Sequence, residues 1–278
     1  MTIATLKEVL GPAMEGGYAV AGLVTLGWED MRAYVRAAEE ESVSIILQAG
    51  PSCRSHTPLP ILGKMFNHLA NEASVPVVAH LDHGYTEEEC REAIECGFTS
   101  VMFDGSRLPL KENIDKTARI AELAHAAEVS CEGEIGFVGY SDGEQSNGTK
   151  PSEVYYFDSE TKIFSIWIFV GNVHLQKNKE GTLDLKTIRQ IEELTSTPLV
   201  IHGGSGVSLA QRSYLAKNSK ICKFNIGTEL RMVFGEALKE SLEKDPTQFD
   251  RVQILSKTND PIVEATRKVL NTFKAEKK

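Results

Sequence analysis

Short apolar runs rich in β-branched residues alternate along the chain with longer segments whose apolar residues recur every three to four positions. The first pattern predicts strands and the second predicts amphipathic helices, and their alternation is typical of repeated βα units around a parallel sheet. Several runs are apolar at almost every position, as expected for strands that are covered on both faces. Eight strands are predicted, at residues 17–26, 43–50, 76–82, 99–104, 129–136, 163–173, 198–203 and 221–226.

Charged, amphipathic segments separate these runs and predict helices at residues 28–41, 59–72, 86–96, 110–127, 183–193, 208–218 and 230–243. The link before residue 163 has no clear pattern, and residues 140–150 are polar and glycine-rich, which predicts a long surface loop. The tail from Pro246 predicts a further helical segment. Eight βα units within 278 residues favour an α/β fold of the (β/α)8 TIM-barrel type over an open doubly wound sheet, with one domain across residues 1–278.

The composition is that of a folded globular protein, with 41% hydrophobic and 25% charged residues. Lys and Arg number 30 against 39 Asp and Glu, and the resulting net charge of −9 argues against nucleic acid or an anionic membrane as the main partner. No apolar stretch approaches the roughly 20 residues that span a bilayer, and no secretory signal is present, so we expect a cytoplasmic protein. The five cysteines form no C-x-x-C pair, which predicts reduced, mostly buried thiols.

Most polar residues suited to chemistry fall where predicted strands end, and in a TIM barrel these C-terminal strand ends form the rim that carries the site. His83, His174 and His202 follow three of the strands and are candidate imidazole ligands of a divalent metal with an open position. A single histidine of this kind is more often a core residue bonded to a backbone carbonyl. Three at equivalent strand ends favour a metal site.

Carboxylates and glycines end the same strands. Asp82 precedes His83, and a carboxylate beside a metal-bound substrate suits general acid or base chemistry, while an aspartate that bonds turn amides is the simpler alternative. Asp104 and Glu134 are candidates to orient the histidines or to supply an extra metal position. The sequence HGGSG at residues 202–206, followed by a predicted helix, favours phosphate recognition after the seventh strand, as does NIGT after the eighth.

Taken together, these motifs resemble the class II, zinc-dependent fructose- and tagatose-bisphosphate aldolases. The matching motifs occur in family order over nearly the whole chain: GYAV at 17–20, H-x-D-H at 80–83, FDGS at 103–106, E-x-E-x-G at 132–136, GNVH at 171–174, HGGSG at 202–206 and K-x-N-I-x-T at 223–228. The resemblance implies a TIM-barrel lyase of carbohydrate metabolism and glycolysis that reversibly joins dihydroxyacetone phosphate, the donor, to an aldehyde. It also implies a phosphorylated sugar as substrate and a homodimer or homotetramer as the assembly.

The resemblance further implies roles for particular residues. His83, His174 and His202 look like zinc ligands, and Asp82 looks like the acid/base that exchanges a proton with the hydroxyl formed on the aldehyde carbon. Zinc would hold the donor's oxygens and stabilise the enediolate formed on deprotonation, without a lysine Schiff base. Glu134 would be a structural or alternative metal ligand, with Asp104 nearby. The phosphate and the donor would be held by further residues, together with a sodium or potassium ion on backbone carbonyls: Gly203, Gly204, Ser205, Asn225 and Thr228.

The chain departs from the family pattern at the donor base and on the acceptor side. The family usually places a glutamate in the loop after E-x-E-x-G, where this chain has Asp142 with Glu144 two residues on, and both are candidates for the base. The family's A-F-N after GYAV is replaced by GLV at residues 22–24, which removes a polar group near the acceptor. The basic residue that holds a distal phosphate has no clear counterpart, and Arg54 and Arg107 are the candidates.

The strand at residues 162–169, KIFSIWIF, is bulkier than the small-residue strand of the family. Since strand side chains alternate, either Trp167 and Phe169 or Ile166 and Ile168 must face the barrel interior. An added ring there either repacks the interior or overfills it.

Three hypotheses account for these residues. The residues that bind the donor in the family look retained, whereas those on the acceptor side look altered. The first hypothesis is therefore a zinc aldolase for a ketose phosphate whose aldehyde differs from glyceraldehyde 3-phosphate. The second is a phosphosugar lyase or epimerase-like relative that keeps the metal and the enediolate. The third is a non-catalytic barrel that binds phosphosugars, which the retention of Asp82 and three histidines disfavours. Three imidazoles accept zinc, cobalt and manganese alike, so the metal stays open.

Overall fold

Eight parallel strands close into a barrel in the computed structural model, which describes residues 2–136, 148–171 and 183–274. Each strand pairs with the next along the chain, and the last pairs with the first. The eight predicted strands are all present, most of them shorter than predicted, and the TIM-barrel prediction is confirmed. The barrel strands are β2 (Val20–Val24), β3 (Ile45–Ala49), β4 (Val77–Gly84), β5 (Ser100–Phe103), β6 (Ser130–Ile135), β7 (Ser165–Ile168), β8 (Leu199–Ile201) and β9 (Ile221–Ile226).

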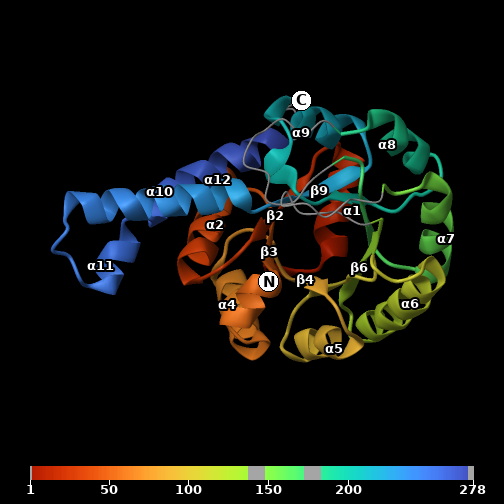
Figure 1. The fold of residues 1–278 in the computed structure, drawn as a ribbon, viewed down its shortest axis with the longest axis horizontal. Coiled ribbons are helices and arrows are strands. Elements are labelled where there is room, and N and C mark those ends of the chain that lie inside the picture. The colour runs from red at the N-terminus through yellow and green to blue at the C-terminus, as the bar shows by residue number, and fades with distance from the viewer. Residues whose placement is uncertain (1, 137–147, 172–182, 275–278) are drawn as a thin grey trace.

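Helices cover the outside of the barrel (Figure 1). The seven predicted helices are found with ends within two residues of the predicted positions. They are α2 (Trp28–Glu41), α4 (Leu59–Glu72), α5 (Glu87–Glu95), α6 (Leu110–Ala126), α8 (Leu185–Glu192), α9 (Leu209–Asn218) and α10 (Thr228–Lys244). The predicted helical tail consists of α11 (Arg251–Ser256) and α12 (Asn259–Phe273). Figure 1 shows α10 and α11 extending away from the barrel, while α12 returns to it.

Within the described residues, five elements were not predicted: β1 (Ile3–Ala4), α1 (Leu6–Gly16), α3 (Pro51–His56), α7 (Pro151–Thr161) and the short 3-10 helix η1 (Gly204–Gly206). The helix α1 is obscured in the sequence by Pro12, which lies inside it, but a capping box between Thr5 and Glu8 starts it and Gly17 (φ +63°) ends it. The helix α7 fills the link that had no clear pattern, with only Val154, Phe157 and Thr161 buried. Among the described residues, no helix is both long and apolar enough to cross a membrane.

The interior of the barrel changes from apolar to polar along its axis. At the N-terminal end, Val20, Ile46, Val78 and Cys222 form one buried cluster with residues of α1, so this helix closes that end of the barrel. The next residues along the strands are polar and fully buried: Gln48, His80, Ser100, Glu132, Ser165 and Lys223. The candidate site lies above this polar layer, at the C-terminal ends of the strands.

Candidate active site

The strand ends bring five of the predicted site residues into two overlapping groups. Asp82, His83 and His202 form one group, and His83, Asp104 and Glu134 form the other, with the potential ligand atoms of each group within 4.8 Å of one another. They come from β4, from β6 and from the residues that follow β5 and β8. His83 belongs to both groups and is therefore the centre of the site.

The backbone at His83 allows neighbouring side chains to share the site. Successive residues of a regular strand point to opposite faces, but β4 is irregular between Leu81 and Gly84. His83 adopts a left-handed conformation (φ +54°), which is uncommon for a residue other than glycine. As a result, Asp82 and His83 both contribute to the cluster at the mouth of the barrel.

Two imidazoles face each other across the first group. His83 Nε2 lies 3.1 Å from His202 Nδ1, and both side chains are buried. Two histidine nitrogens that each bind one zinc ion at about 2.0–2.1 Å can be this far apart, and imidazole is a preferred ligand for zinc and similar ions. Asp82 adds a carboxylate oxygen to the same group. The donor set therefore fits a divalent metal.

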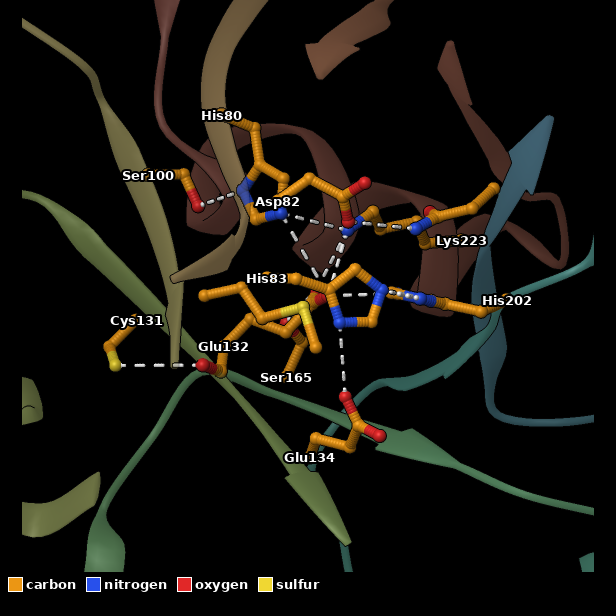
Figure 2. A network of polar contacts seen from close by, with 12 residues as sticks. His80, Asp82, His83, Ser100, Cys131, Glu132, Glu134, Ser165, His202 and Lys223 are labelled. Carbon is orange, nitrogen blue, oxygen red and sulfur yellow. Dashed lines mark hydrogen bonds and ion pairs between the residues drawn. The ribbon is translucent and has the colours of Figure 1, made fainter. Parts of the chain in front are cut away.

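The other nitrogen of His83 faces carboxylates. Its Nδ1 lies 2.7 Å from Asp104 Oδ2 and 3.4 Å from Glu134 Oε2, as Figure 2 shows for Glu134. The second oxygen of Asp104 accepts hydrogen bonds from the hydroxyl (2.6 Å) and the backbone N–H (3.2 Å) of Ser106, which fixes the carboxylate. A carboxylate behind a histidine sets its tautomer and ring orientation, so Asp104 is placed to direct Nε2 toward His202.

The ionisable groups around His83 shift one another's pKa. Burial disfavours the protonated imidazole, but the charge of Asp82 and the contacts with Asp104 and Glu134 raise the pKa of His83 well above its usual value. Burial would also raise the pKa of Asp104, but the hydrogen bond and charge of His83 outweigh it and hold that pKa well below the usual range. Burial and the charge of Asp104 raise the pKa of Glu134 well above normal. The cluster thus favours a cation at His83.

Beneath the site, a buried ion pair crosses the barrel (Figure 2). Lys223 Nζ donates to both carboxylate oxygens of Glu132 at 2.9 Å, and the Ser165 hydroxyl donates to Glu132 Oε2 at 2.8 Å. His80 lies between Lys223 Nζ (3.2 Å) and the Ser100 hydroxyl (2.8 Å), and burial and the charge of Lys223 lower its pKa well below normal. A neutral His80 with Nδ1–H toward Ser100 therefore accepts from Lys223 through Nε2.

Trp167 lies against both imidazoles of the site. Its ring centroid is 4.5 Å from that of His202 and 6.2 Å from that of His83, and the indole is fully buried. Ile166 and Ile168 belong to the main hydrophobic core, whereas Trp167 packs with Val200 in a separate small cluster. Of the two alternating sets left open by the sequence, the one with Trp167 therefore faces the barrel interior.

The residues expected at the phosphate are adjacent in space. Gly203 has φ +63°, and a Cβ at Gly204 would lie 2.9 Å from the backbone oxygen of Asn225, so the turn needs glycine. The Ser205 hydroxyl accepts from the backbone N–H groups of Gly227 (3.2 Å) and Glu229 (3.4 Å). This bond ties the glycine turn to the N-terminus of α10, whose first residue is Thr228. Amides and the helix dipole favour an anion there.

At Gly22 on β2, the side chain of Gln48 fills the space that the glycine leaves. A Cβ at Gly22 would lie 1.9 Å from Gln48 Oε1 and 2.6 Å from Asn225 Oδ1. The Asn225 amide donates to Asp82 Oδ1 at 3.5 Å. Gln48 is fully buried, and within the described ranges neither of its amide atoms has a hydrogen-bond partner. Sequence reasoning missed Gln48, and its strand position gave no signal beyond an isolated polar residue in an apolar run.

Arg54, one of the two candidates for binding a distal phosphate, is already committed to the barrel. Its guanidinium donates to the backbone oxygens of Ala49 (2.7 Å), Asp82 (2.6 Å) and His83 (2.9 Å), and to Glu89 Oε1 (2.8 Å). Four of its five N–H donors are used in these four bonds. Arg54 therefore holds the ends of β3 and β4, including the carbonyl of His83, and we assign it no phosphate. Arg107, the other candidate for a distal phosphate, is exposed in the segment between β5 and α6, and its role stays a prediction. Three further predicted residues lie outside the described residues: His174, Asp142 and Glu144.

The fold and the site together define an α/β-barrel enzyme, because ionisable side chains converge at the C-terminal strand ends. A family model described as class II fructose-bisphosphate aldolase matches residues 4–278. The chain belongs to the class II fructose-bisphosphate aldolase family and is an aldolase, a carbon–carbon lyase. The family is typically metal-dependent, which agrees with the cluster around His83.

Similar proteins support this membership along the whole chain. A fructose-bisphosphate aldolase of Geobacillus stearothermophilus is 35% identical over 94% of this chain and 93% of that protein. A probable fructose-bisphosphate aldolase of Bacillus subtilis is 34% identical over 95% of each. Among solved structures, the YdjI aldolase from Escherichia coli K12 aligns with a TM-score of 0.85 and 26% identity, covering 99% of this chain and 98% of that one.

Proposed function

We propose that this aldolase cleaves and forms a ketose phosphate by metal-assisted chemistry, with dihydroxyacetone phosphate as the donor and an aldehyde other than glyceraldehyde 3-phosphate as the acceptor. The observation that carries the proposal is the convergence of Asp82, His83 and His202 within 4.8 Å at the C-terminal rim. Imidazoles and a carboxylate in this arrangement suit a catalytic metal with an open position for substrate.

His83 and His202 would hold the metal, with His174 as the third imidazole in our proposal. Zinc is the ion we propose, and when bound it would act as a Lewis acid that stabilises negative charge on the deprotonated donor. Asp104 would keep His83 oriented through its 2.7 Å contact, and Glu134 would supply either support or an alternative ligand position. A sodium or potassium ion on backbone carbonyls would complete the donor site in the proposal.

Two different carboxylates would transfer the two protons of the reaction, one on the substrate hydroxyl and one on the donor carbon. Asp82 would take the proton from the substrate hydroxyl during cleavage and return it during synthesis, because it lies beside the two imidazoles and is almost fully buried. Asp142 or Glu144 would exchange the proton on the donor carbon. The turn at Gly203, Gly204 and Ser205, with Asn225 and Thr228, would hold the donor and its phosphate, since it meets the N-terminus of α10.

The acceptor side supports an aldehyde other than glyceraldehyde 3-phosphate. Arg54 is bonded to backbone oxygens of β3 and β4 and does not present a cation to a distal phosphate. At the end of β2, beside Gln48 of β3, Gly22 and Val24 have no side-chain group that can donate or accept a hydrogen bond. A less charged acceptor would suit these residues better than a phosphorylated one.

The donor half of the proposal predicts proton exchange without any aldehyde. Protein loaded with Zn²⁺ and given dihydroxyacetone phosphate in deuterated buffer should replace a donor-carbon proton by deuterium, followed by NMR, and a chelator should stop the exchange. A metal-loaded protein that exchanges no proton would contradict this donor and would move the function toward another ketose phosphate or toward binding alone.

The acceptor half predicts a distinct order of substrates. In steady-state cleavage assays of several ketose phosphates, a ketose 1-phosphate that lacks a distal phosphate should give a higher kcat/KM than fructose 1,6-bisphosphate. Assays at constant ionic strength and with saturating metal separate this preference from general charge effects. If fructose 1,6-bisphosphate were clearly the best substrate, the acceptor proposal would be wrong while the donor proposal would stand.

A further inference from the structure

We propose that Trp167 is a positioning residue of the metal centre, whose indole holds the imidazoles of His202 and His83 in the orientation that ligation requires. The inference rests on the proposed function, because it takes these two histidines as metal ligands. It concerns a residue whose chemistry plays no part in the proton transfers proposed above.

Three aromatic rings contact one another at the site. The Trp167 and His202 centroids are 4.5 Å apart with the planes tilted by 54°, and the Trp167 and His83 centroids are 6.2 Å apart, edge to face at 75°. The two imidazoles are 4.9 Å apart and nearly perpendicular, at 86°. Each ring therefore limits the rotation of the other two about their side-chain bonds.

The surroundings of Trp167 tie it to the site rather than to the core. On β7 it pairs in register with Glu134 of β6 and with Val200 of β8, so it stands between a candidate ligand and the strand that leads to His202. Val200 is the only other fully buried member of its apolar cluster among the described residues, with Phe169 packed at the edge. Beyond this small cluster, the indole lies against the pair of imidazoles.

An aromatic wall at this place has a physical consequence for metal binding. Imidazole must direct a nitrogen lone pair at the ion, and any rotation that the free protein allows has to be given up on binding. Removing the indole would leave a space beside the imidazole nitrogens of His83 and His202. Water can enter such a polar space and form hydrogen bonds with these nitrogens. Water would then compete for the same nitrogens, and the ligands would no longer be pre-oriented.

The chain offers a matched control for the test. Trp28, the other of the two tryptophans in the sequence, also stacks on a histidine. The ring centroids of Trp28 and His68 are 6.1 Å apart and their planes are at 25°. That pair takes no part in either group of potential ligands. Trp28→Ala thus removes the same side chain and a similar ring contact, but not at the site.

The experiment measures Zn²⁺ affinity by competition with a chelating dye for the full-length wild type and for W167A, W167F, W167L and W28A. Altered outer contacts of metal ligands typically cost about 10–100-fold in affinity, and we expect a loss in that range for W167A. The Zn²⁺ affinity of W167F should stay close to that of the wild type, because a phenyl ring still packs against the imidazoles. The affinity of W167L should lie between those of W167F and W167A, because an aliphatic side chain replaces the ring less well. W28A should bind as tightly as the wild type.

Two spectroscopic signals report on the site without any substrate. In a W28F background Trp167 is the sole tryptophan, and its emission should change when Zn²⁺ is added, because the adjacent imidazoles are fixed on the ion. The visible spectrum of the Co²⁺-loaded protein should differ between W167A and the wild type, since it depends on ligand geometry. If W167A does not fold, the order of affinities of W167F above W167L still tests the proposal.

Equal Zn²⁺ affinities for the wild type and W167A, or for W167F and W167L, would overturn the positioning role of Trp167 while leaving the metal centre in place. A wild type that binds no metal, or a His202→Ala variant that binds as tightly as the wild type, would overturn the metal centre and this inference with it. Unchanged Trp167 emission on saturation with Zn²⁺ would also count against the positioning role.

Discussion

Replacing Lys223 by methionine should lower the free energy of unfolding by about 3–5 kcal/mol, the usual cost of removing one partner from a buried ion pair. Lys223 and Glu132 are both fully buried, and Lys223 Nζ donates to both oxygens of the carboxylate at 2.9 Å. Methionine has nearly the volume of lysine, so the loss would come from the unpaired Glu132 and the lost bond to His80 rather than from a cavity. Equilibrium unfolding in urea gives the measurement.

The pH dependence of this loss follows from the carboxylate. In the wild type, burial would raise the pKa of Glu132, but the charge of Lys223 and the hydrogen bonds from Lys223 and Ser165 hold it below normal. That lowered pKa contributes stability that is present above the pKa of an unfolded glutamate and is lost as the pH falls through the folded value. Without Lys223, burial should raise the pKa of Glu132, so the variant gains stability from protonation and its deficit should shrink between about pH 8 and pH 5.

The double variant E132Q/K223M is the matched control. Replacing both charges of a buried pair by neutral groups of similar volume is often close to neutral in stability. The glutamine side chain of the double variant can still accept from the Ser165 hydroxyl, whose bond to the wild-type carboxylate is 2.8 Å. The double variant should therefore recover most of the loss and lose the unusual pH dependence. A double variant as unstable as K223M would show that the pair is not the source of the effect.

The barrel could be predicted from the sequence because its pattern is strong and local. Strands such as β9, apolar at most positions, and helices such as α2, with a sharp change from charged to apolar faces, appear at the predicted residues. The helix α7 was missed because Tyr155 and Tyr156 are exposed on it and few of its residues are buried, so its apolar residues show no helical period. The helix α1 was missed because Gly11 and Pro12 interrupt its pattern.

The candidate site was predictable as a set of residues but not as a set of contacts. A strand end places a side chain at the rim, which is why Asp82, His83 and His202 could be grouped from their positions in the sequence. The partners within the barrel depend on strand register and on side-chain direction across it. The pairing of Lys223 with Glu132 joins residues 91 positions apart, and no local pattern shows it.

Arg54 illustrates the same limit. It was one of two candidates for the basic residue with which the family holds a distal phosphate, but the end of β4 turns at His83 and presents carbonyl oxygens that need a donor. The guanidinium meets that need with a geometry of several parallel donors that lysine lacks. A backbone conformation set by φ at one residue thus decided the role of a side chain that sequence alone left open.

Asp82→Asn should reduce aldol cleavage by about 100- to 10,000-fold, the contribution typical of a positioned acid or base. Asparagine keeps the size of the side chain but cannot carry the proton of the substrate hydroxyl. Exchange of the donor proton in deuterated buffer should persist, because in our proposal a different carboxylate, Asp142 or Glu144, moves that proton. Cleavage of the ketose phosphate and donor exchange are measured on the same metal-loaded preparation.

The contrast with Asp104→Asn separates acid/base chemistry from support of the metal. Asp104 contacts His83 Nδ1 at 2.7 Å, so its variant should weaken Zn²⁺ binding and depress cleavage and donor exchange together. Asp82 lies in the group with both imidazoles, and its oxygen could serve as a ligand instead of a proton carrier. If D82N loses metal affinity and donor exchange in step with cleavage, Asp82 is a ligand and the proton of the substrate hydroxyl must be carried by another group.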